Sequence, residues 1–455
     1  HQLEIRQREI TGSGMPFGLQ IMLNCLPACI HNDNPLEILD LDNAFNTIKE
    51  NLKSENYIES LIEKNLISNS HRLNYSLIPD TEFNRKNEEK IQQKVIEKTR
   101  DLSHKDKEDI IQLANDLESR QNAHDDPEIL PKVTKNDIPQ SRTYACPVIS
   151  SHNSNSSYFY KTGTNGIVYH SMLFPCDALN QNELKVASLF TSTLTDIGLG
   201  EDSYEDIQKY QSSITGGISA SFVTLPNKED NSYKLALKVS SKSLEKNDLL
   251  MQDLMLKTVN ESSFLEQNRI KELLEFISAD NEKSVIQNGH ILSMGNAASQ
   301  ISSIAATNDL TSGLQFIHNT SNLSRLMNDE NEFKLYLDTL HSIKNKLSSD
   351  PNYLFTASSL DINDLKLNTI FKSEPINFNN QSFVATQDSS IGWITGSQVC
   401  FCAEAFPSVD SMHEDAPALT ILGTVLRNGY LHSAIREKGG ACLLYTSPSP
   451  RDVEE

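Results

Sequence analysis

Apolar residues recur at helical spacing in some segments of the chain and at every second position in others. The first change from a helical to a strand-like pattern comes before residue 80. Residues 17–30 are a nearly continuous apolar run, which predicts a buried helix, and residues 42–65 predict a second helical stretch. Residues 71–78 alternate apolar and polar side chains and stop at Pro79-Asp80, as a strand does before a turn. The first 80 residues therefore predict the end of a compact unit built from helices and strands.

Residues 81–125 are strongly polar and carry apolar side chains only at helical spacing, in two groups. The members are Ile91, Val95 and Leu102, followed by Ile110, Leu113 and Leu117. Ser103 and Asp106 have the spacing of a capping box, so a second helix is expected to begin there. We expect a hairpin of two polar helices followed by an extended linker, together filling residues 81–140.

Strand and helix patterns return over residues 141–381. The expected strands are 157–160, 166–174, 218–225 and 233–239, the last with apolar side chains at every second position. Asn180 and Glu183 predict the capped start of a helix, and Gly216-Gly217 a bend before a strand. Long helical patterns fill residues 244–347. A sheet with flanking helices places this segment in the α+β class.

A last unit is expected over residues 382–441. Residues 399–403 have the character of a strand, and Asp415-Ala416-Pro417 predicts the start of a helix that ends at Asn428-Gly429. The side chains of Leu419, Leu422 and Leu426 are expected to share one apolar face of that helix.

The charge of the chain narrows the classes of partner. With 40 basic and 61 acidic residues the formal net charge is −21, so we expect no nucleic-acid partner, because phosphates require a basic face. The least charged stretch, residues 15–30, is too short to span a bilayer, so no membrane partner is expected either.

Seven cysteines, an odd number without a C-x-x-C pair, indicate a reducing compartment with thiols buried as small hydrophobic side chains. Cys25 and Cys29 lie one helical turn apart, and Cys400 and Cys402 would share a strand face. Neither pair has partner ligands at zinc spacing, so buried thiols are the expectation.

Five sets of residues, in the same order along the chain, resemble the presequence proteases, which are inverzincins related to pitrilysin and insulin-degrading enzyme. The sets are Gly14–Leu19 with Pro27–His31, His71-Arg72 before Pro79-Asp80, Thr164–Ile167, Thr215–Ser221 and Arg436–Ala441. Each set alone is a weak signal, but their common order from His1 to Ala441 is a specific one.

The resemblance implies repeated α/β sandwich units of the pitrilysin and insulinase type, in two halves joined by a helical hairpin. It implies that residues 1–80 end the second unit, that 81–140 are the hairpin and linker, that 141–381 are the third unit with its helices, and that 382–441 begin the fourth. It also implies a zinc metalloendopeptidase that degrades unfolded peptides, such as cleaved targeting presequences, inside a closed chamber. The implied location is the mitochondrial matrix or the bacterial cytoplasm.

In this family zinc is held by an H-x-x-E-H helix and a distal Glu, and the Glu of the motif activates the bound water. None of the twelve histidines here belongs to such a motif, and His413-Glu414-Asp415 reads as an ordinary helix start. His31 and His71 are expected to be structural. We therefore expect no metal in this chain, zinc only in an intact protein with a missing N-terminal half, and no activity from these residues alone.

The family also places a substrate-contacting arginine before Gly-Gly-Ala and a tyrosine after it. Arg436 matches the arginine, whose planar fork suits a carboxylate or a carbonyl, while Cys442 stands at the tyrosine position. A surface ion pair is the plainer interpretation of Arg436, and tight backbone geometry that of Gly439-Gly440. Residues 442–455 resemble a translated sequencing adapter, and we expect this artefact to pack against nothing.

Two further interpretations stay open on the sequence. Related subunits without zinc motifs act as scaffolds, so the chain is alternatively a non-catalytic homologue of the same family. A helical protein-interaction module built around residues 81–125 is the other alternative, and it predicts flanking segments without α/β units.

Overall fold

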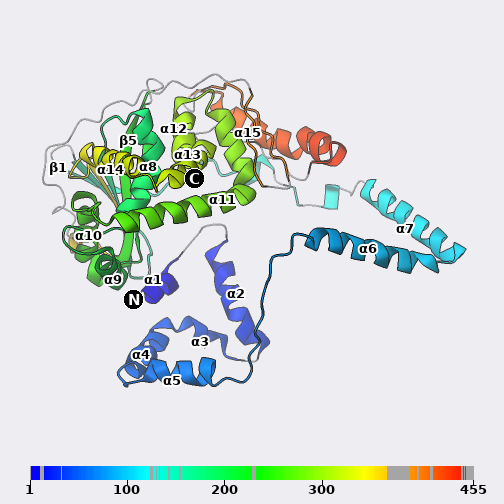
Figure 1. Ribbon diagram of the computed structural model, residues 1–455, viewed down its shortest axis with the longest axis horizontal. Helices are drawn as coiled ribbons and strands as arrows, with labels where there is room; N and C mark the ends of the chain where they lie inside the picture. The colour runs from blue at the N-terminus through cyan, green and yellow to red at the C-terminus, as the bar shows by residue number, and fades with distance from the viewer. Residues whose placement is uncertain are drawn as a thin grey trace. The chain divides into compact units, whose positions relative to one another are not determined.

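The computed structural model describes residues 2–10, 15–31, 33–122, 127–129, 131–132, 134–141, 144–152, 155–227, 232–365, 390–396, 399–409, 413–441, 444 and 446. By its internal contacts the chain divides into two compact units, one made of residues 1–41 and 145–455 and the other of residues 42–144. Figure 1 shows the elements of both units.

The larger unit is built on one mixed sheet. Its strands are β1 (Val148–His152), β2 (Asn155–Lys161), β3 (Ile167–Pro175), β4 (Ile218–Pro226), β5 (Tyr233–Leu244) and β6 (Tyr353–Ser358). Among the described residues the spatial order is β1-β2-β6-β3-β5-β4, and every neighbouring pair is antiparallel except β2 with β6. The sheet expected from the sequence is thus present and is mostly antiparallel, and with the helices described next it confirms the α+β class.

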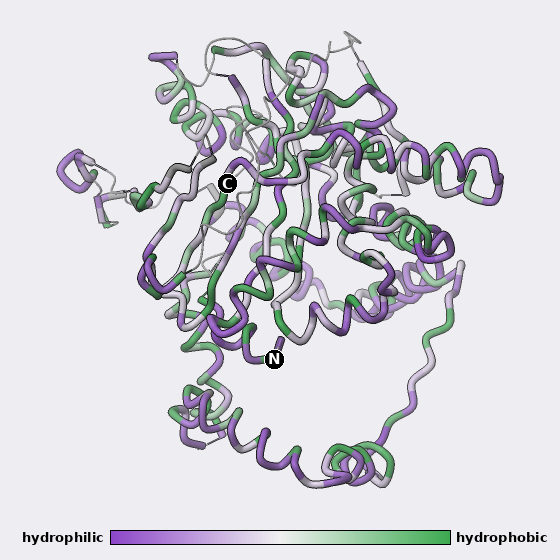
Figure 2. Tube along the Cα trace, turned by 90° about the vertical axis from the view of Figure 1, so that its left-hand side faces the viewer, coloured by the Kyte–Doolittle hydropathy of each residue, from purple (hydrophilic) through white to green (hydrophobic). Residues whose placement is uncertain are grey.

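Strand β5 shows how the alternating sequence produces the sheet. Its odd-numbered residues from Tyr233 to Val239 are buried, and Lys238 between them is exposed, because successive side chains of a strand point to opposite faces. The strands in Figure 2 accordingly carry bands of hydrophobic and hydrophilic residues. One face of the sheet is therefore apolar and requires a covering layer.

Helices α8 to α14 supply that layer. Their bounds are α8 (Gln181–Leu194), α9 (Tyr204–Ile214), α10 (Asp248–Asn260), α11 (Gln267–Ala298), α12 (Ser303–Ser312), α13 (Leu314–Leu326) and α14 (Glu330–Asn345). Their buried side chains and the inward face of the sheet form one continuous hydrophobic core. Helix α8 begins where the sequence predicted, since the side chain of Asn180 accepts from the backbone N–H of Glu183, and the Glu183 carboxylate accepts from that of Asn180.

The N-terminal segment of this unit contains α1 (Gln2–Arg8), α2 (Phe17–Ile30) and α3 (Pro35–Leu39). Ile5 of α1 is 1% exposed and packs with Ile167 and Leu244, at the ends of β3 and β5. Gly217, which precedes β4, has φ of 113°, a backbone conformation that favours glycine. The expected bend before this strand is thus confirmed.

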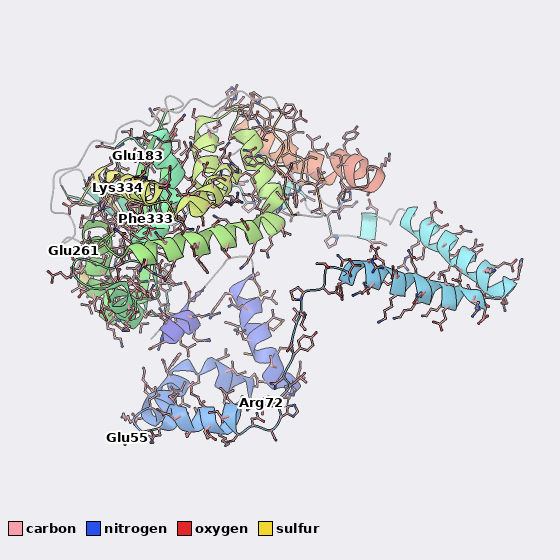
Figure 3. The ribbon with its side chains drawn as sticks, in the orientation of Figure 1. Glu55, Arg72, Glu183, Glu261, Phe333 and Lys334 are labelled. Atoms are coloured by element: carbon pink, nitrogen blue, oxygen red, sulfur yellow. The ribbon has the colours of Figure 1, made fainter. Side chains whose placement is uncertain are left out.

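The smaller unit is helical. It contains α4 (Leu41–Asn51), α5 (Tyr57–Ile62), a turn of π-helix η1 (Glu63–Ile67), α6 (Phe83–Arg100), α7 (His104–Asn122) and the short 3₁₀ turns η2 (Pro127–Ile129) and η3 (Lys135–Asp137). The capping box expected at Ser103 is present, because Ser103 and Asp106 exchange hydrogen bonds between side chain and backbone. Arg72 donates to the carbonyls of Leu66 and Ile67 at 2.7 Å and so caps η1 (Figure 3).

Four expectations about local structure are wrong. Residues 17–30 form the expected helix α2, but only Ala28 of it is buried. Residues 71–78 are extended but form no strand, and residues 399–403 form none either, because within the described residues neither segment finds a neighbouring strand to pair with. The helix expected over 42–65 is interrupted at residues 52–56, where Asn56 adopts φ of 66°.

The C-terminal segment contains the 3₁₀ turn η5 (Ile362–Asp364), α15 (Ala416–Asn428) and a turn of π-helix η7 (His432–Lys438). Helix α15 ends at the expected glycine, and Leu422 and Leu426 are exposed on it while Leu419 is half-buried. The boundary drawn between residues 381 and 382 lies outside the described residues. Of the tail, Leu444 and Thr446 are described and half-buried, and the Thr446 hydroxyl donates to the carbonyl of Gly423, which corrects the expectation that these residues touch nothing.

Among the helices that the structure describes, none combines the length and the apolar character that a membrane crossing requires.

Candidate functional site

Arg436, the residue singled out by sequence, lies exposed in η7. Within the part of the chain that the structure describes, its guanidinium makes no hydrogen bond or ion pair, so the surface ion pair is not formed there. Its carbonyl accepts the backbone N–H of Gly440 at 3.2 Å, which closes the turn. The arrangement leaves all five guanidinium donors available.

The two glycines after Arg436 serve the backbone, as expected. Gly440 has φ of 76°, and a Cβ added at Gly439 would lie 2.6 Å from the carbonyl oxygen of Ile435. These positions therefore fix where η7 stops, in the manner of a glycine C-cap. Cys442, at the position compared with the family tyrosine, lies outside the described residues.

The histidines named from the sequence do not gather. His31 and His71 are both exposed, and the Nδ1 atom of His413 accepts the backbone N–H of Asp415 at 3.2 Å, at the start of α15. Over the described residues no three side chains among His, Cys, Asp and Glu lie close enough together to hold a metal ion. The donor set that an inverzincin zinc requires is therefore not assembled by these residues.

The structure also tests the expectation that the cysteine thiols are buried. Cys176 is buried, and burial raises the pKa of its thiol to about 12. The other cysteines that the structure describes are exposed or half-exposed: Cys25, Cys29, Cys146, Cys400 and Cys402. The expectation of buried thiols is wrong for these five, because their helix and loops leave the thiols at least partly open to solvent.

One cluster of chemistry-bearing side chains was missed by the sequence reasoning. His170 of β3 lies with its Nε2 atom 2.6 Å from an Asp248 oxygen and its Nδ1 atom 2.8 Å from the Thr356 hydroxyl. Gln252 donates to the other oxygen of Asp248 at 2.9 Å. The order hydroxyl, imidazole, carboxylate matches that of a hydrolase triad.

Burial decides the role of this cluster. His170 is 1% exposed, Thr356 is 2% and Asp248 is 7%, so no substrate carbonyl reaches the hydroxyl. The network instead joins β3, β6 and α10 through polar contacts inside the core, and within the described structure only the side-chain oxygen of Gln252 is left without a hydrogen-bond partner in it. Apolar residues alternate along β3, and position 170 falls on the buried side of that alternation. This pattern in the sequence could have identified His170 as a structural histidine.

A groove of about 730 Å³ lies beside β4. It is lined by Ala220 and Ser221 of β4, by residues of α11 that include Phe276, Asp280 and Ile291, and by parts of α8, α12 and α13. Phe276 is 71% exposed and Ile291 is 46% exposed, so the groove offers apolar surface to solvent. No sequence motif pointed to this place, because its walls come from segments that are far apart in the chain.

The comparisons with known proteins agree with the order of motifs. The chain is 25% identical over 470 residues to the mitochondrial presequence protease of Eremothecium gossypii, an alignment that covers 97% of this chain and 46% of that protein. The presequence protease of Drosophila melanogaster is 24% identical, with 93% of this chain and 42% of that protein covered. The "Protein HypA" of Clostridium perfringens is 24% identical, with coverage of 97% and 46%. The chain thus spans just under half the length of the curated relatives it matches.

A crystal structure of a conserved protein from Enterococcus faecalis V583 overlaps 50% of this chain and 53% of its own chain, with 11% identity and a TM-score of 0.33. That overlap is too weak to support an argument about fold or function.

The family described as peptidase M-16C associated matches residues 77–323, which is more than half of the chain and includes five of the six strands. Together with the alignments to presequence proteases, this match shows that the chain belongs to the peptidase M-16C associated family.

Proposed function

We propose that this chain is part of a zinc metalloendopeptidase that degrades unfolded peptides, such as cleaved targeting presequences, inside a closed chamber. The observation that carries the proposal is the collinear similarity to presequence proteases over 97% of the chain. Repeated α/β units joined by the helices α6 and α7 would form the wall of that chamber, with the domain boundaries proposed from the sequence.

The zinc ion of the intact protein is held by other residues than these. The sequence contains no H-x-x-E-H motif, and the described residues gather no metal-binding group. When bound, the ion supplies Lewis-acid activation of water. The 455 residues are accordingly inactive alone and act with a further N-terminal half of the same protein.

The part of this chain in the reaction is to hold the substrate. Arg436 is exposed with its donors available, and a guanidinium binds a peptide carboxylate or carbonyl through two parallel hydrogen bonds. The partners are unfolded peptides, with no role for nucleic acid or membrane. The location is the mitochondrial matrix or the bacterial cytoplasm, since named relatives include mitochondrial proteases and a clostridial protein.

The test compares the 455 residues with the product of the full reading frame. We expect the 455 residues to bind a labelled unfolded peptide but to hold no stoichiometric zinc and to hydrolyse nothing. The full product is expected to hold one zinc and to show chelator-sensitive hydrolysis. Chelator-sensitive hydrolysis by the 455 residues alone would overturn the proposal. A full product without zinc or hydrolysis would favour a non-catalytic scaffold instead.

A matched pair of variants tests Arg436. Peptide affinity is expected to fall about tenfold in Arg436→Ala, the loss of a charge-assisted contact, and to stay unchanged in Lys438→Ala, another exposed cation in the same turn. Equal effects of the two substitutions would reduce Arg436 to one surface charge among others.

A further inference from the structure

The outer edge of β4 is a sheet edge without a partner strand in the described structure. β4 is the last strand in the spatial order and pairs with β5 on one side only. Within the described residues, no backbone hydrogen bond reaches it from the other side. Its first eight residues, Ile218–Leu225, include no proline and no charged side chain, which are the usual protections of an exposed edge.

The groove meets β4 near the start of the strand. Ala220 and Ser221 both line it, although successive side chains of a strand point to opposite faces of the sheet. Both line one groove when that groove lies at the edge, where the backbone N–H and C=O groups point. The rest of the lining comes from α8, α11, α12 and α13, so an extended segment placed in the groove would have the backbone of β4 as one neighbour and side chains of these helices as the others.

The residues that line the groove indicate which chemical groups a bound segment would carry. Phe276 and Ile291 are exposed apolar contacts, and Asp280 is the one charged residue among the described lining residues. The backbone of β4, paired with β5 on one side only, supplies N–H donors beside these side chains. A matching segment therefore offers carbonyl oxygens, apolar side chains and a lysine or arginine.

We propose that the edge of β4 and this groove bind a basic, unfolded peptide segment as an added strand. The inference rests on the proposed function and assigns a substrate-binding surface to it. The net charge of −21 favours a basic ligand and opposes a second copy of the chain.

The first experiment probes the backbone pairing with the chain unchanged. The probe is a fluorescently labelled nine-residue peptide, the length of β4, with alternating leucine and threonine and one central arginine. Only one edge of an added strand pairs with β4. We expect N-methylation of every second amide to weaken binding about tenfold in one register and to leave it unchanged when shifted by one residue. Equal affinities in both registers would overturn the proposal.

The second experiment probes the groove with variants of exposed residues, which leave the core intact. We expect Phe276→Ser to weaken binding of the same peptide about tenfold, and Asp280→Asn about threefold, with a smaller effect at high salt. Glu275→Gln, an exposed control next to Phe276 outside the groove lining, is expected to bind as the wild type does.

The outcomes separate this inference from the proposed function. Peptide binding that ignores the groove variants and the methylation register would overturn the inference and leave the proposed function intact. No peptide binding at all would contradict both. Dimerisation in analytical ultracentrifugation that Phe276→Ser abolishes would assign the edge to a second copy and would also overturn the inference.

Discussion

Glu183 is a buried carboxylate that joins the start of α8 to the end of α14 (Figure 3). It accepts from the Lys346 ammonium at 2.6 Å and from the Ser342 hydroxyl at 2.7 Å. Burial alone would raise the pKa of Glu183, but the hydrogen bonds from Lys346, Ser342 and the Asn180 backbone outweigh it and lower the pKa below its ordinary value.

We expect Glu183→Gln to lower the free energy of unfolding by about 2 kcal/mol at pH 7, because it leaves the Lys346 ammonium without its carboxylate. A depressed pKa means that the stabilisation is complete above the ordinary glutamate pKa and is lost as the pH falls through the folded value. Urea denaturation at neutral and acidic pH measures the difference between wild type and variant, which should shrink in acid. Glu275→Gln, an exposed control, should show no such pattern.

Gly217 separates backbone strain from side-chain crowding. Its φ is 113°, yet a Cβ added there would meet nothing within 4 Å. Gly217→Ala is therefore expected to lower the free energy of unfolding by about 1 kcal/mol or more through strain alone. Gly163 has equally open space without a positive φ, so Gly163→Ala should be neutral or slightly stabilising. Thermal unfolding of both variants makes the comparison, and equal melting temperatures would contradict the argument.

At the scale of single elements, the capping box of α8 carries a local prediction. The side chain of Asn180 accepts two backbone N–H groups at the first turn, from Asn182 and Glu183. Asn180→Ala should lower the free energy of unfolding by about 1 kcal/mol, as the loss of an N-cap does. Asn182→Ala removes an exposed side chain from the same turn and serves as the control. Because alanine has a higher helix propensity than asparagine, a similar loss in both would contradict the assignment of the effect to the N-cap.

Helix starts and turns were predictable because their causes lie within a few residues of sequence. The caps at Asn180 and Ser103, the end of α15 at Gly429 and the bend at Gly217 all appear where the sequence placed them. The strands of the sheet were predictable where burial on one face imposed alternation, as in β5.

The sequence could not show which strand-like segments would fail to form a strand, because strand pairing depends on segments that are distant in the chain. Residues 71–78 alternate as well as β5 does, yet in the described structure nothing lies beside them to accept their hydrogen bonds. The groove at β4 has the same origin, since α8, α11 and β4 meet only in the fold. Arg436 was found through the resemblance of its motif alone, and its partner position at Cys442 lies outside the described residues.

At the scale of the whole molecule, the chain exposes more apolar surface than a monomeric protein usually does. Leu73 is 88% exposed, Tyr75 is 81% and Leu77 is 84%, all on one side of an extended segment. Met22, Leu23 and Ile30 of α2 and Ile421 and Val425 of α15 are exposed too. Apolar surface of this extent favours association with another surface.

This exposure predicts that the 455 residues associate, and that salt promotes the association. The net charge of −21 makes copies of the chain repel one another at low ionic strength. At about 0.15 M salt the screening length falls to roughly 8 Å, so the repulsion weakens and copies can approach closely enough for apolar contacts to form. We expect light scattering and binding of a hydrophobic dye to rise with salt. Replacing Leu73, Tyr75 and Leu77 by serine should lower both, while Asn74→Ala with Ser76→Ala, on the other side of the segment, should not. A chain that stays monomeric at high salt and binds no dye would show that these side chains are covered in solution and would contradict the prediction.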